Sequence, residues 1–395
     1  MTTEVFVPKI PYGTRDLLQG DANRKRNIEA ALGKLFASWG YDEVVTPTIE
    51  YLETLSVGNA TDLQHNMFKF FDKSNRILAL RPDMTTPIAR VAATRLRERA
   101  LPLKLFYLTN VFRYEEAQAG RQCEFYQAGI ELLGVSDPTA DAEVIAIAVE
   151  AMLEAGLTSF QVSLGQVEFI HGIMNECGLP LTQQQAVKQS LVKRDLVGMG
   201  EILQNSGLCP TAQKILTQVP VLHGRQDMLK QAYDMVTNQT SRNALDNLSE
   251  IYNILVSYGV DKYVNFDLGI IRDFEYYTGM VFEGYTPGLG FPLCGGGRYD
   301  KMVSSFGVDC PATGFALGIE RILLAMERQG IAISPDSKDI YIGWNKGMFD
   351  AAIVEASQQR RAGKTVELAF KPQSQLEAAT SQVAKGYNKL TYIGG

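Results

Sequence analysis

The stretch LKLFYLTNVFRYEEAQAGRQCEFYQAGIELLG, residues 103–134, indicates the type of fold more directly than any other part of the chain. Two runs rich in aromatic and β-branched residues flank a polar loop that contains a glycine, and this arrangement predicts an antiparallel β-hairpin. Arg113 ends the first strand. Gln127 and Glu131 lie four residues apart on the second strand, so the alternation of side chains places both on one face. That face is expected to carry polar groups of both signs.

Strand and helix patterns outside the hairpin predict a mixed fold. Amphipathic helices are expected at 21–40 and 137–156, where apolar residues recur at helical spacing and Asp137 suits the N-cap. Strands are expected at FQVSLGQ (160–166), YVNFDLGII (263–271), YYTGMVFEGY (276–285) and FPLCGGGRYD (291–300). A mainly antiparallel sheet with helices outside it follows, which is an α+β architecture.

The length of 395 residues predicts two or three domains at about 150 residues each. Strand patterns are lost from about 167 to 260, where helical periods predict a helical insertion. From 336 to 395 the pattern alternates β-α-β-α-β, which suggests a small α/β domain with a parallel sheet. We therefore expect a core domain at 1–330, containing the insertion, and a second domain at 336–395.

Composition and charge exclude several classes of protein. The chain has 38 basic and 44 acidic residues, so its net charge of −6 gives no general cationic field, and a nucleic-acid role would need a local patch. The N-terminus lacks a secretory signal pattern, no run of eighteen uncharged apolar residues occurs, and the five cysteines form no C-x-x-C pair. A cytoplasmic protein with no membrane span is expected.

Common catalytic and cofactor motifs are absent from the sequence. It contains no H-E-x-x-H, Walker phosphate loop, G-x-S-x-G or strand-led G-x-G-x-x-G. The three histidines, His65, His171 and His223, are far apart in the chain. We expect neither a metal ion nor a cofactor.

Polar residues embedded in apolar segments form the candidate site. In LALRPDMTTPIARV, Arg81, Asp83 and Thr85 occupy alternate positions of a segment expected to be extended, and Arg272 precedes Tyr277 by five residues. Carboxylate, amide and hydroxyl groups suit an α-ammonium group, and the paired donors of arginine suit an α-carboxylate. Together these residues could hold a free amino acid. Alternatively, each is an ordinary solvated or salt-bridged residue at the end of a strand.

Two glycine-containing segments near the end of the core domain add to this set. In CGGGRYD, three successive glycines allow close backbone approach and place Tyr299 beside a surface suited to a ligand. In GFALGIERILLAM, Arg321 follows Glu320 inside a helix that we expect to be apolar from Phe315 to Met326. Burying that guanidinium without a partner would be costly, so we expect an anion or a carboxylate to meet it.

Seven motifs occur in the order found in histidyl-tRNA synthetases: PYGTRD, TPTIE, LRPDMTTPIAR, VFRYEEAQAGRQCEFYQAGIELLG, RDFEYYTGMVFE, GGGRYDKM and GFALGIERIL. VFRYE with its loop resembles the second class II synthetase motif, and GFALGIER resembles the third. RDFEYY and GGRYD resemble the two histidine-specific segments of that family. The resemblance spans nearly the whole chain and implies a class II aminoacyl-tRNA synthetase-like sheet flanked by helices.

Several positions depart from the synthetase pattern. Asp83 is shorter than the glutamate that is usual there, Glu116 and Ala117 stand where Arg-Pro is usual, and Cys123 takes the place of an arginine. The C-terminal domain resembles a truncated anticodon-binding domain. It carries eight basic and six acidic residues from Ile331 onward, which is a weak electrostatic footprint for tRNA.

This combination resembles the family of regulatory subunits of ATP phosphoribosyltransferase, which are paralogues of the synthetases. The resemblance implies a protein without chemistry of its own that binds histidine for feedback control. It would assemble with the short-form catalytic subunit for the first step of histidine biosynthesis, as a homodimeric core within a hetero-oligomer and without tRNA. The dimer would form around the 24–41 helix and Pro47. The alternative is an active histidyl-tRNA synthetase that forms histidyl-adenylate and charges tRNA.

The resemblance also assigns roles to individual residues. Positions that match histidine contacts of the family are Asp83, Thr85, Gln127, Glu131, Arg272, Tyr277 and Tyr299. The first three would hold the ammonium group, and Glu131 with Tyr277 would read the imidazole nitrogens. Arg272 and Tyr299 would complete the site near the carboxylate and the ring. Positions that match phosphate-contacting arginines of the synthetases are Arg113, Arg121 and Arg321, and their presence here leaves open structure, anion binding or nucleotide affinity.

Overall fold

The structure is a computed structural model that describes residues 8–57, 64–114, 122–270, 276–331 and 338–394. Two compact units divide the chain: Met1–Leu17 with Lys25–Ile331, and Leu18–Arg24 with Ala332–Gly395. Each unit has a sheet and a buried apolar core of its own.

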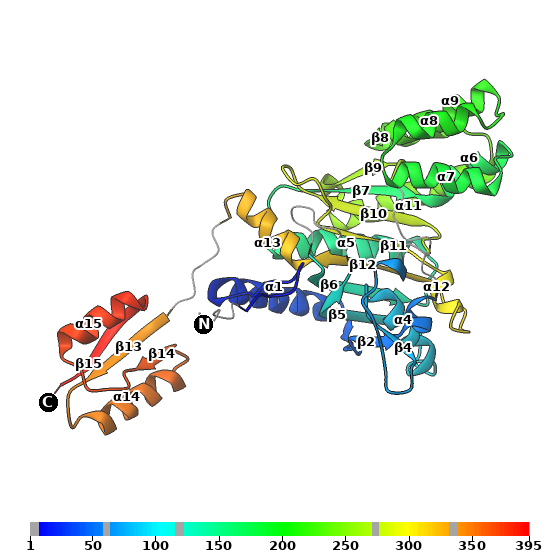
Figure 1. The fold of residues 1–395 in the computed structure, drawn as a ribbon. Helices are drawn as coiled ribbons and strands as arrows, with labels where there is room; N and C mark the ends of the chain where they lie inside the picture. The colour runs from blue at the N-terminus through cyan, green and yellow to red at the C-terminus, as the bar shows by residue number, and fades with distance from the viewer. Residues whose placement is uncertain (1–7, 58–63, 115–121, 271–275, 332–337, 395) are drawn as a thin grey trace, which may run out of the picture. The chain divides into compact units, whose positions relative to one another are not determined.

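A nine-stranded sheet forms the centre of the first unit in the described part of the chain (Figure 1). From one edge to the other its strands are β1 (Asp42–Glu43), β5 (Leu103–Phe112), β6 (Glu124–Leu133), β12 (Ala312–Gly318), β11 (Cys294–Arg298), β10 (Met280–Tyr285), β7 (Gln161–Gln166), β9 (Val264–Asp267) and β8 (His223–Gly224). The β1–β5 and β7–β9 pairs are parallel and the other pairs are antiparallel. The predicted α+β architecture with a mainly antiparallel sheet is confirmed.

The predicted hairpin forms the β5–β6 pair. The two strands pair along their whole length, from Leu103 opposite Leu133 to Phe112 opposite Glu124. The other side of β6 pairs with β12, where Glu131 lies opposite Gly314. Strand β6 is therefore hydrogen-bonded on both sides, which fixes the direction of every side chain along it.

One face of the sheet packs against α1 (Gln19–Ser38) and α5 (Pro138–Glu154). The ring of Phe36 on α1 contacts Phe106 of β5 and Phe315 of β12, at centroid distances of 5.7 and 6.1 Å. Asp137 caps α5 as predicted, because its carboxylate accepts a hydrogen bond from the Thr139 backbone at 2.9 Å. We call this the α5 face of the sheet.

The opposite face packs against α4 (Thr85–Thr94) and α12 (Lys301–Ser304). Ile88 of α4 and Met302 of α12 are fully buried in one cluster with Leu105 and Tyr107 of β5. Because side chains alternate along a strand, the odd-numbered residues of β5 and β6 point to this face. Gln127 and Glu131 therefore share one face, as predicted, and α4 packs on that side of the sheet. We call this the α4 face.

Between β7 and β9 the chain is mostly helical, as expected for 167–260. The elements are α6 (Val167–Glu176), α7 (Leu181–Val192), α8 (Leu196–Gln204), α9 (Pro210–Gln218), the 3-10 helix η1 (Val219–Val221), α10 (Gln226–Met235), α11 (Gln239–Tyr258) and the 3-10 helix η2 (Asp261–Tyr263). Helices α6 to α9 lie together in Figure 1. The expectation of no strand here is wrong at one point, since β8 pairs with the edge of β9. No helix that the structure describes is long and apolar enough to cross a membrane.

A small antiparallel sheet precedes α4, with strand order β2 (Ile49–Tyr51), β4 (Ile77–Leu80) and β3 (Lys69–Phe71), and α2 (Leu52–Leu55) follows β2. Arg81 comes directly after β4 and is buried. Its guanidinium donates to the backbone oxygens of Thr46 and Asn110, at 2.8 and 3.0 Å. These bonds tie the small sheet to β5, so the structure gives Arg81 an anchoring position.

The second unit contains the predicted β-α-β-α-β pattern. Its elements are β13 (Lys338–Trp344), α14 (Phe349–Arg361), β14 (Val366–Leu368), α15 (Gln375–Ala384) and β15 (Tyr387–Ile393). The strands are parallel and lie in the order β14, β13, β15. Ile342 is fully buried at the centre of the core of this unit.

Two expected local structures are wrong. The segment 312–318 is strand β12 and the helix α13 (Ile319–Arg328) begins only at Ile319, so Phe315 belongs to the sheet. The cause is pairing with β6 on one side and β11 on the other, which outweighs a helical apolar pattern. Thr85 is the first residue of α4 and does not continue the extended segment expected for Arg81 and Asp83, because the Met84 carbonyl already accepts from the Ile88 backbone.

Candidate functional site

Glu131 lies at the centre of the α4 face and is 2% exposed. The Tyr299 hydroxyl donates to its Oε2, and the Thr85 hydroxyl donates to its Oε1 at 3.2 Å. These three residues come from β6, from the segment after β11 and from the start of α4. Residues 46 and 168 positions apart in the chain therefore meet at one carboxylate.

Burial dominates the electrostatics of this carboxylate. Loss of solvent raises the pKa of Glu131 to about 8, although the hydrogen bonds from Tyr299 and Thr85 favour the charged form. The nearby carboxylate of Asp83 raises the pKa of Glu131 further. At neutral pH Glu131 therefore holds a proton that a positively charged neighbour would displace.

Asp83 is a second buried carboxylate, placed two residues before the start of α4. Its Oδ1 accepts from the Thr86 backbone at 3.4 Å, while its Oδ2 is buried and has no hydrogen-bond partner among the described residues. Burial raises the pKa of Asp83, and the charge of Arg113 opposes this shift. Arg113 is held beside it because its Nε donates to the Pro82 carbonyl at 2.8 Å. Asp83 thus offers an open acceptor close to Glu131.

Aromatic side chains surround the two carboxylates. The ring of Tyr276 contacts Tyr277 and Tyr299 at centroid distances of 4.8 and 5.9 Å. Tyr107 of β5 is 1% exposed, and its pKa is raised by burial and by the charges of Glu131 and Asp83. The Glu131 cluster is defined here as Asp83, Thr85, Tyr107, Glu131, Tyr277 and Tyr299. Its members combine two acidic groups with hydroxyl donors in a setting shielded from water.

Two glycines in the strands leave room for this cluster. A Cβ on Gly314 would collide with the Glu131 carboxylate, which lies opposite it in the sheet. A Cβ on Gly129 would collide with the Tyr107 hydroxyl. Any side chain at these two positions would push the carboxylate or the phenol away, so the absence of a Cβ shapes the site.

Gln127 and Arg321 lie further along the α4 face. Gln127 is buried, its Oε1 has no hydrogen-bond partner among the described residues, and it lies opposite Gly318 in the sheet. The stem of Arg321 passes close to Gly318. The expected burial of Arg321 is wrong: its side chain is exposed, donates to the Pro292 carbonyl at 2.6 Å and lies over the ring of Phe291. The helix α13 begins only at Ile319, so Arg321 lies in its first turn, and Glu320 beside it accepts a hydrogen bond from the Tyr126 backbone.

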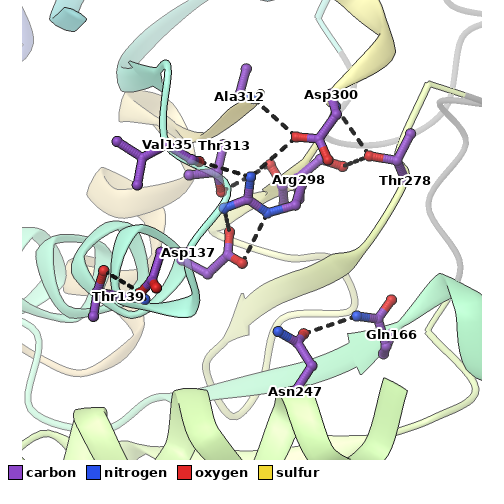
Figure 2. Close-up of polar contacts among 12 residues, drawn as sticks. Val135, Asp137, Thr139, Gln166, Asn247, Thr278, Arg298, Asp300, Ala312 and Thr313 are labelled. Atoms are coloured by element: carbon purple, nitrogen blue, oxygen red, sulfur yellow. Dashed lines mark hydrogen bonds and ion pairs between the residues drawn. The ribbon is translucent and has the colours of Figure 1, made fainter. Parts of the chain in front are cut away.

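A buried ion-pair network lies behind the cluster, on the α5 face (Figure 2). Arg298 at the end of β11 pairs with Asp141 of α5 through two contacts of 3.0 Å. It also donates to the Val135 carbonyl and to Asp300, at 3.0 and 3.1 Å. The next residue in the chain is Tyr299, so the network holds the backbone that carries one member of the Glu131 cluster.

Comparisons with known proteins identify relatives of this chain. The family model for histidyl-tRNA synthetases matches residues 13–322. A protein of Desulforamulus reducens named ATP phosphoribosyltransferase regulatory subunit is 41% identical, over all of this chain and 97% of its own length. A protein of the same name from Moorella thermoacetica is 42% identical, over 98% of each chain.

Solved structures of related proteins have the same fold as this chain. A crystal structure described as an ATP phosphoribosyltransferase regulatory subunit/histidyl-tRNA synthetase from Bacillus halodurans has a TM-score of 0.88 at 34% identity, covering 99% of this chain and all of its own. The histidyl-tRNA synthetase of Nostoc has a TM-score of 0.85 at 20% identity, covering 99% of this chain and 92% of its own, which shows the shared fold. The chain belongs to the family of ATP phosphoribosyltransferase regulatory subunits.

The structure brings most of the residues expected to form the site together. Asp83, Thr85, Glu131, Tyr277 and Tyr299 gather at one place, with Arg113 beside Asp83. Gln127 lies on the same face of β6 as Glu131. Arg121 and Arg272 lie outside the described residues. Among the described residues no group of three or more His, Cys, Asp or Glu side chains could hold a metal ion.

Two parts of the site were not predicted from the sequence. Tyr107 resembles any aromatic residue of a core strand, and only its position beside Glu131 distinguishes it. Arg298 carried a usable signal: an arginine after three glycines and before Tyr299, in an otherwise apolar strand, needs a buried partner. Asp141, inside a helix that is apolar almost throughout, carried the matching signal.

Proposed function

We propose that this chain binds free histidine at the Glu131 cluster, and that this binding controls a short-form catalytic subunit of ATP phosphoribosyltransferase. The observation that carries the proposal is the pair of buried carboxylates, Glu131 and Asp83, held by hydroxyl and aromatic groups in a member of this family. The regulatory subunit would have no chemistry of its own.

The chemistry of the cluster suits the functional groups of histidine. A buried carboxylate without a cationic partner is unfavourable, so a ligand that brings an ammonium or an imidazole N–H gains by pairing with it. We assign the ammonium group to Asp83, Thr85 and Gln127, since Asp83 and Gln127 each present an acceptor without a partner among the described residues. Glu131 and Tyr277 would bind the imidazole nitrogens. Arg272 and Tyr299 complete the proposed contacts.

Feedback control follows if histidine binds two states of the assembly with different affinity. The effect on the catalytic subunit then equals the coupling free energy between the histidine site and the partner's active site, typically about 1–3 kcal/mol. The expected result is lower transferase activity when histidine is bound. The partner itself would condense ATP with phosphoribosyl pyrophosphate.

Co-expression with a short-form catalytic subunit tests the proposal. We expect the purified pair to have transferase activity that the catalytic subunit alone lacks, and histidine to inhibit it. In the pair with Glu131→Ala, activity should remain while inhibition by histidine is lost. If the wild-type pair gains no activity over the catalytic subunit alone, the regulatory function is wrong.

An active histidyl-tRNA synthetase is the second candidate, because Arg113 lies beside Asp83 and Arg321 is exposed at the end of the same face. Arginines in these positions could meet the phosphates of ATP. Histidine-dependent exchange of pyrophosphate into ATP separates the two functions. Robust exchange by the purified chain would favour the synthetase, and histidine binding without exchange would favour the regulatory subunit.

A homodimeric core is also proposed. Val45 and Ile49, which flank the predicted Pro47 contact, are 86% and 46% exposed, so this segment offers apolar surface to a second copy. Sedimentation equilibrium of the chain alone should give the mass of a dimer. A monomer that persists at high concentration would contradict this arrangement.

A further inference from the structure

Arg298 is a buried cation whose contacts reach three other parts of the chain. It is 7% exposed, and its guanidinium meets the Asp141 carboxylate on α5, the Val135 carbonyl before α5 and the Asp300 carboxylate. Asp141 is 1% exposed, and its charge is opposite to that of the guanidinium it meets. The planar guanidinium fits several acceptors at fixed angles at once, which a lysine ammonium does not do.

The contacts of Arg298 converge on the backbone that presents two tyrosines. Side chains alternate along a strand, so Arg298 points to the α5 face while Tyr299 points to the α4 face, where its hydroxyl meets Glu131. The Arg298 carbonyl accepts from the Thr278 backbone at 2.8 Å, and the Thr278 hydroxyl accepts from the Asp300 backbone at 3.0 Å. Thr278 directly follows Tyr277 in the chain.

Asp300 closes the network on the other side. Its Oδ1 accepts both from Arg298 and from the Ala312 backbone at 3.0 Å, at the start of β12 (Figure 2). The Ala312 carbonyl in turn accepts from the Tyr299 backbone at 2.8 Å. Tyr299 is thus fixed by bonds on both flanking residues and on its own backbone.

We propose that Arg298 is a positioning residue for the ligand site: its ion pair with Asp141 sets the place of Tyr299 at the Glu131 carboxylate and, through Thr278, of Tyr277. The ligand part of this inference rests on the proposed histidine binding. Arg298 touches no ligand itself, because it lies on the α5 face. Its effect is carried by the backbone of residues 298–300.

Arg298→Lys tests the inference, because it keeps the positive charge and loses the planar pairing with Asp141, Val135 and Asp300. Lys104→Met is the matched control: Lys104 of β5 pairs with Glu143 of the same helix α5 at 2.8 Å, away from β11. The first readout is the ¹³C carboxyl titration of Glu131 in the ligand-free protein, assigned by its loss in Glu131→Gln. The second readout is the dissociation constant of histidine from calorimetry.

A displaced Tyr299 hydroxyl would no longer stabilise the charged form of Glu131, so the titration midpoint of Glu131 should rise. We expect a rise of about half a unit to one unit in Arg298→Lys, no change in Lys104→Met, and histidine affinity about tenfold weaker in Arg298→Lys only. A Glu131 titration that matches the wild type, or shifts equally in both variants, overturns the inference. If the wild type binds no histidine, the proposed function fails, and the titration still decides the positioning role.

Arg298→Lys could fail to fold, because it disturbs a buried ion pair. Asp300→Ala then replaces it, since the Asp300 side chain is 37% exposed and removal deletes the acceptor shared by Arg298 and Ala312. The Glu131 midpoint should rise in this variant as well, by a smaller amount. An unchanged midpoint in folded Asp300→Ala would overturn the inference in the same way.

Discussion

Glu131 is deeply buried, and the groups that hydrogen-bond to it are uncharged, a combination that is rare at a structural residue. It is a carboxylate deep in an apolar sheet, and both hydroxyls that reach it, from Tyr299 and Thr85, are donors and carry no charge. Burial therefore raises its pKa to about 8. A stability cost of this kind is typical of functional sites, since the same group would be cheaper to place elsewhere.

Glu131→Gln should change the pH dependence of stability. In the unfolded chain Glu131 has an ordinary pKa near 4.5, whereas the folded value is about 8. Between these values the native state keeps a proton that the unfolded state releases, so the Glu131 contribution falls as the pH rises from about 4.5 to 8. The free energy of unfolding of the wild type should drop by up to about 5 kcal/mol relative to the variant over this window. Urea unfolding at a series of pH values measures the difference.

The difference between the two proteins should level off above pH 8, where Glu131 is ionised in both states. A difference that stays constant between pH 5 and pH 8 would show that Glu131 is not shifted in the folded protein. Gln keeps the size of the side chain, so packing changes contribute a constant offset without a slope.

Tyr299→Phe should weaken histidine binding by about tenfold or more, because a hydrogen bond to a charged group typically contributes about 1.5–3 kcal/mol. Tyr285→Phe is the matched control. It removes a tyrosine hydroxyl that donates to Glu283 at 2.5 Å on β10, outside the Glu131 cluster. Calorimetry should show weaker binding in Tyr299→Phe and wild-type affinity in Tyr285→Phe. Equal affinity in the wild type and both variants would show that the Tyr299 hydroxyl does not contribute to histidine binding.

Much of the site was predictable at the scale of single residues. Alternation along β6 placed Gln127 and Glu131 on one face, and family resemblance supplied Asp83 and Tyr299. Arg321 was not predictable, since its burial depended on where α13 begins. The pairing of Arg298 with Asp141 was also not predictable, although each residue carried a signal of its own, because the two lie 157 positions apart and only tertiary structure joins them.

At the scale of elements, strand β12 shows how glycine placement shapes the site. Gly314 faces Glu131 directly, and the backbone around it has no room for a methyl group. Gly314→Ala should therefore displace the Glu131 carboxylate and abolish measurable histidine binding, with a stability loss of about 1–3 kcal/mol from overpacking.

Gly290→Ala is the control for this prediction. Apart from the two chain neighbours of Gly290, no described residue has an atom within 4 Å of a Cβ placed there, so this variant should bind histidine like the wild type and unfold at the same urea concentration. Calorimetry and urea unfolding of both variants provide the test. Wild-type affinity in Gly314→Ala would mean that the Glu131 carboxylate can move without loss of the ligand.

The elements that sequence patterns missed share one physical cause. The apolar run from Phe315 onward fits a helix on its own, yet its first four residues lie between β6 and β11 and complete two ladders of backbone hydrogen bonds. Strand β8 likewise depends on pairing with β9, since a strand of two residues is too short to show a sequence pattern. The helix α5 and the β5–β6 hairpin were predicted because each is a long continuous segment whose own pattern of apolar residues indicates its structure.

The whole molecule contains two tryptophans, and each compact unit holds one. Trp39, which directly follows α1, donates to Glu150 of α5 at 2.9 Å, in the unit that contains the Glu131 cluster. Trp344 on β13 donates to the Ala369 carbonyl at 2.7 Å and is 8% exposed, in the other unit. Alternating β and α segments predicted this second sheet, and each unit has a separate apolar core.

Histidine should therefore stabilise only one of the two units. A ligand at about 100 times its dissociation constant adds about 2.7 kcal/mol to the state that binds it. In Trp344→Phe, fluorescence reports the first unit through Trp39, and saturating histidine should move its urea midpoint upward. In Trp39→Phe, fluorescence reports the second unit through Trp344, and its midpoint should stay in place, because the ligand contacts no residue there. Equal shifts in both variants would show that the two cores unfold together, and no shift in either would contradict histidine binding to the folded protein.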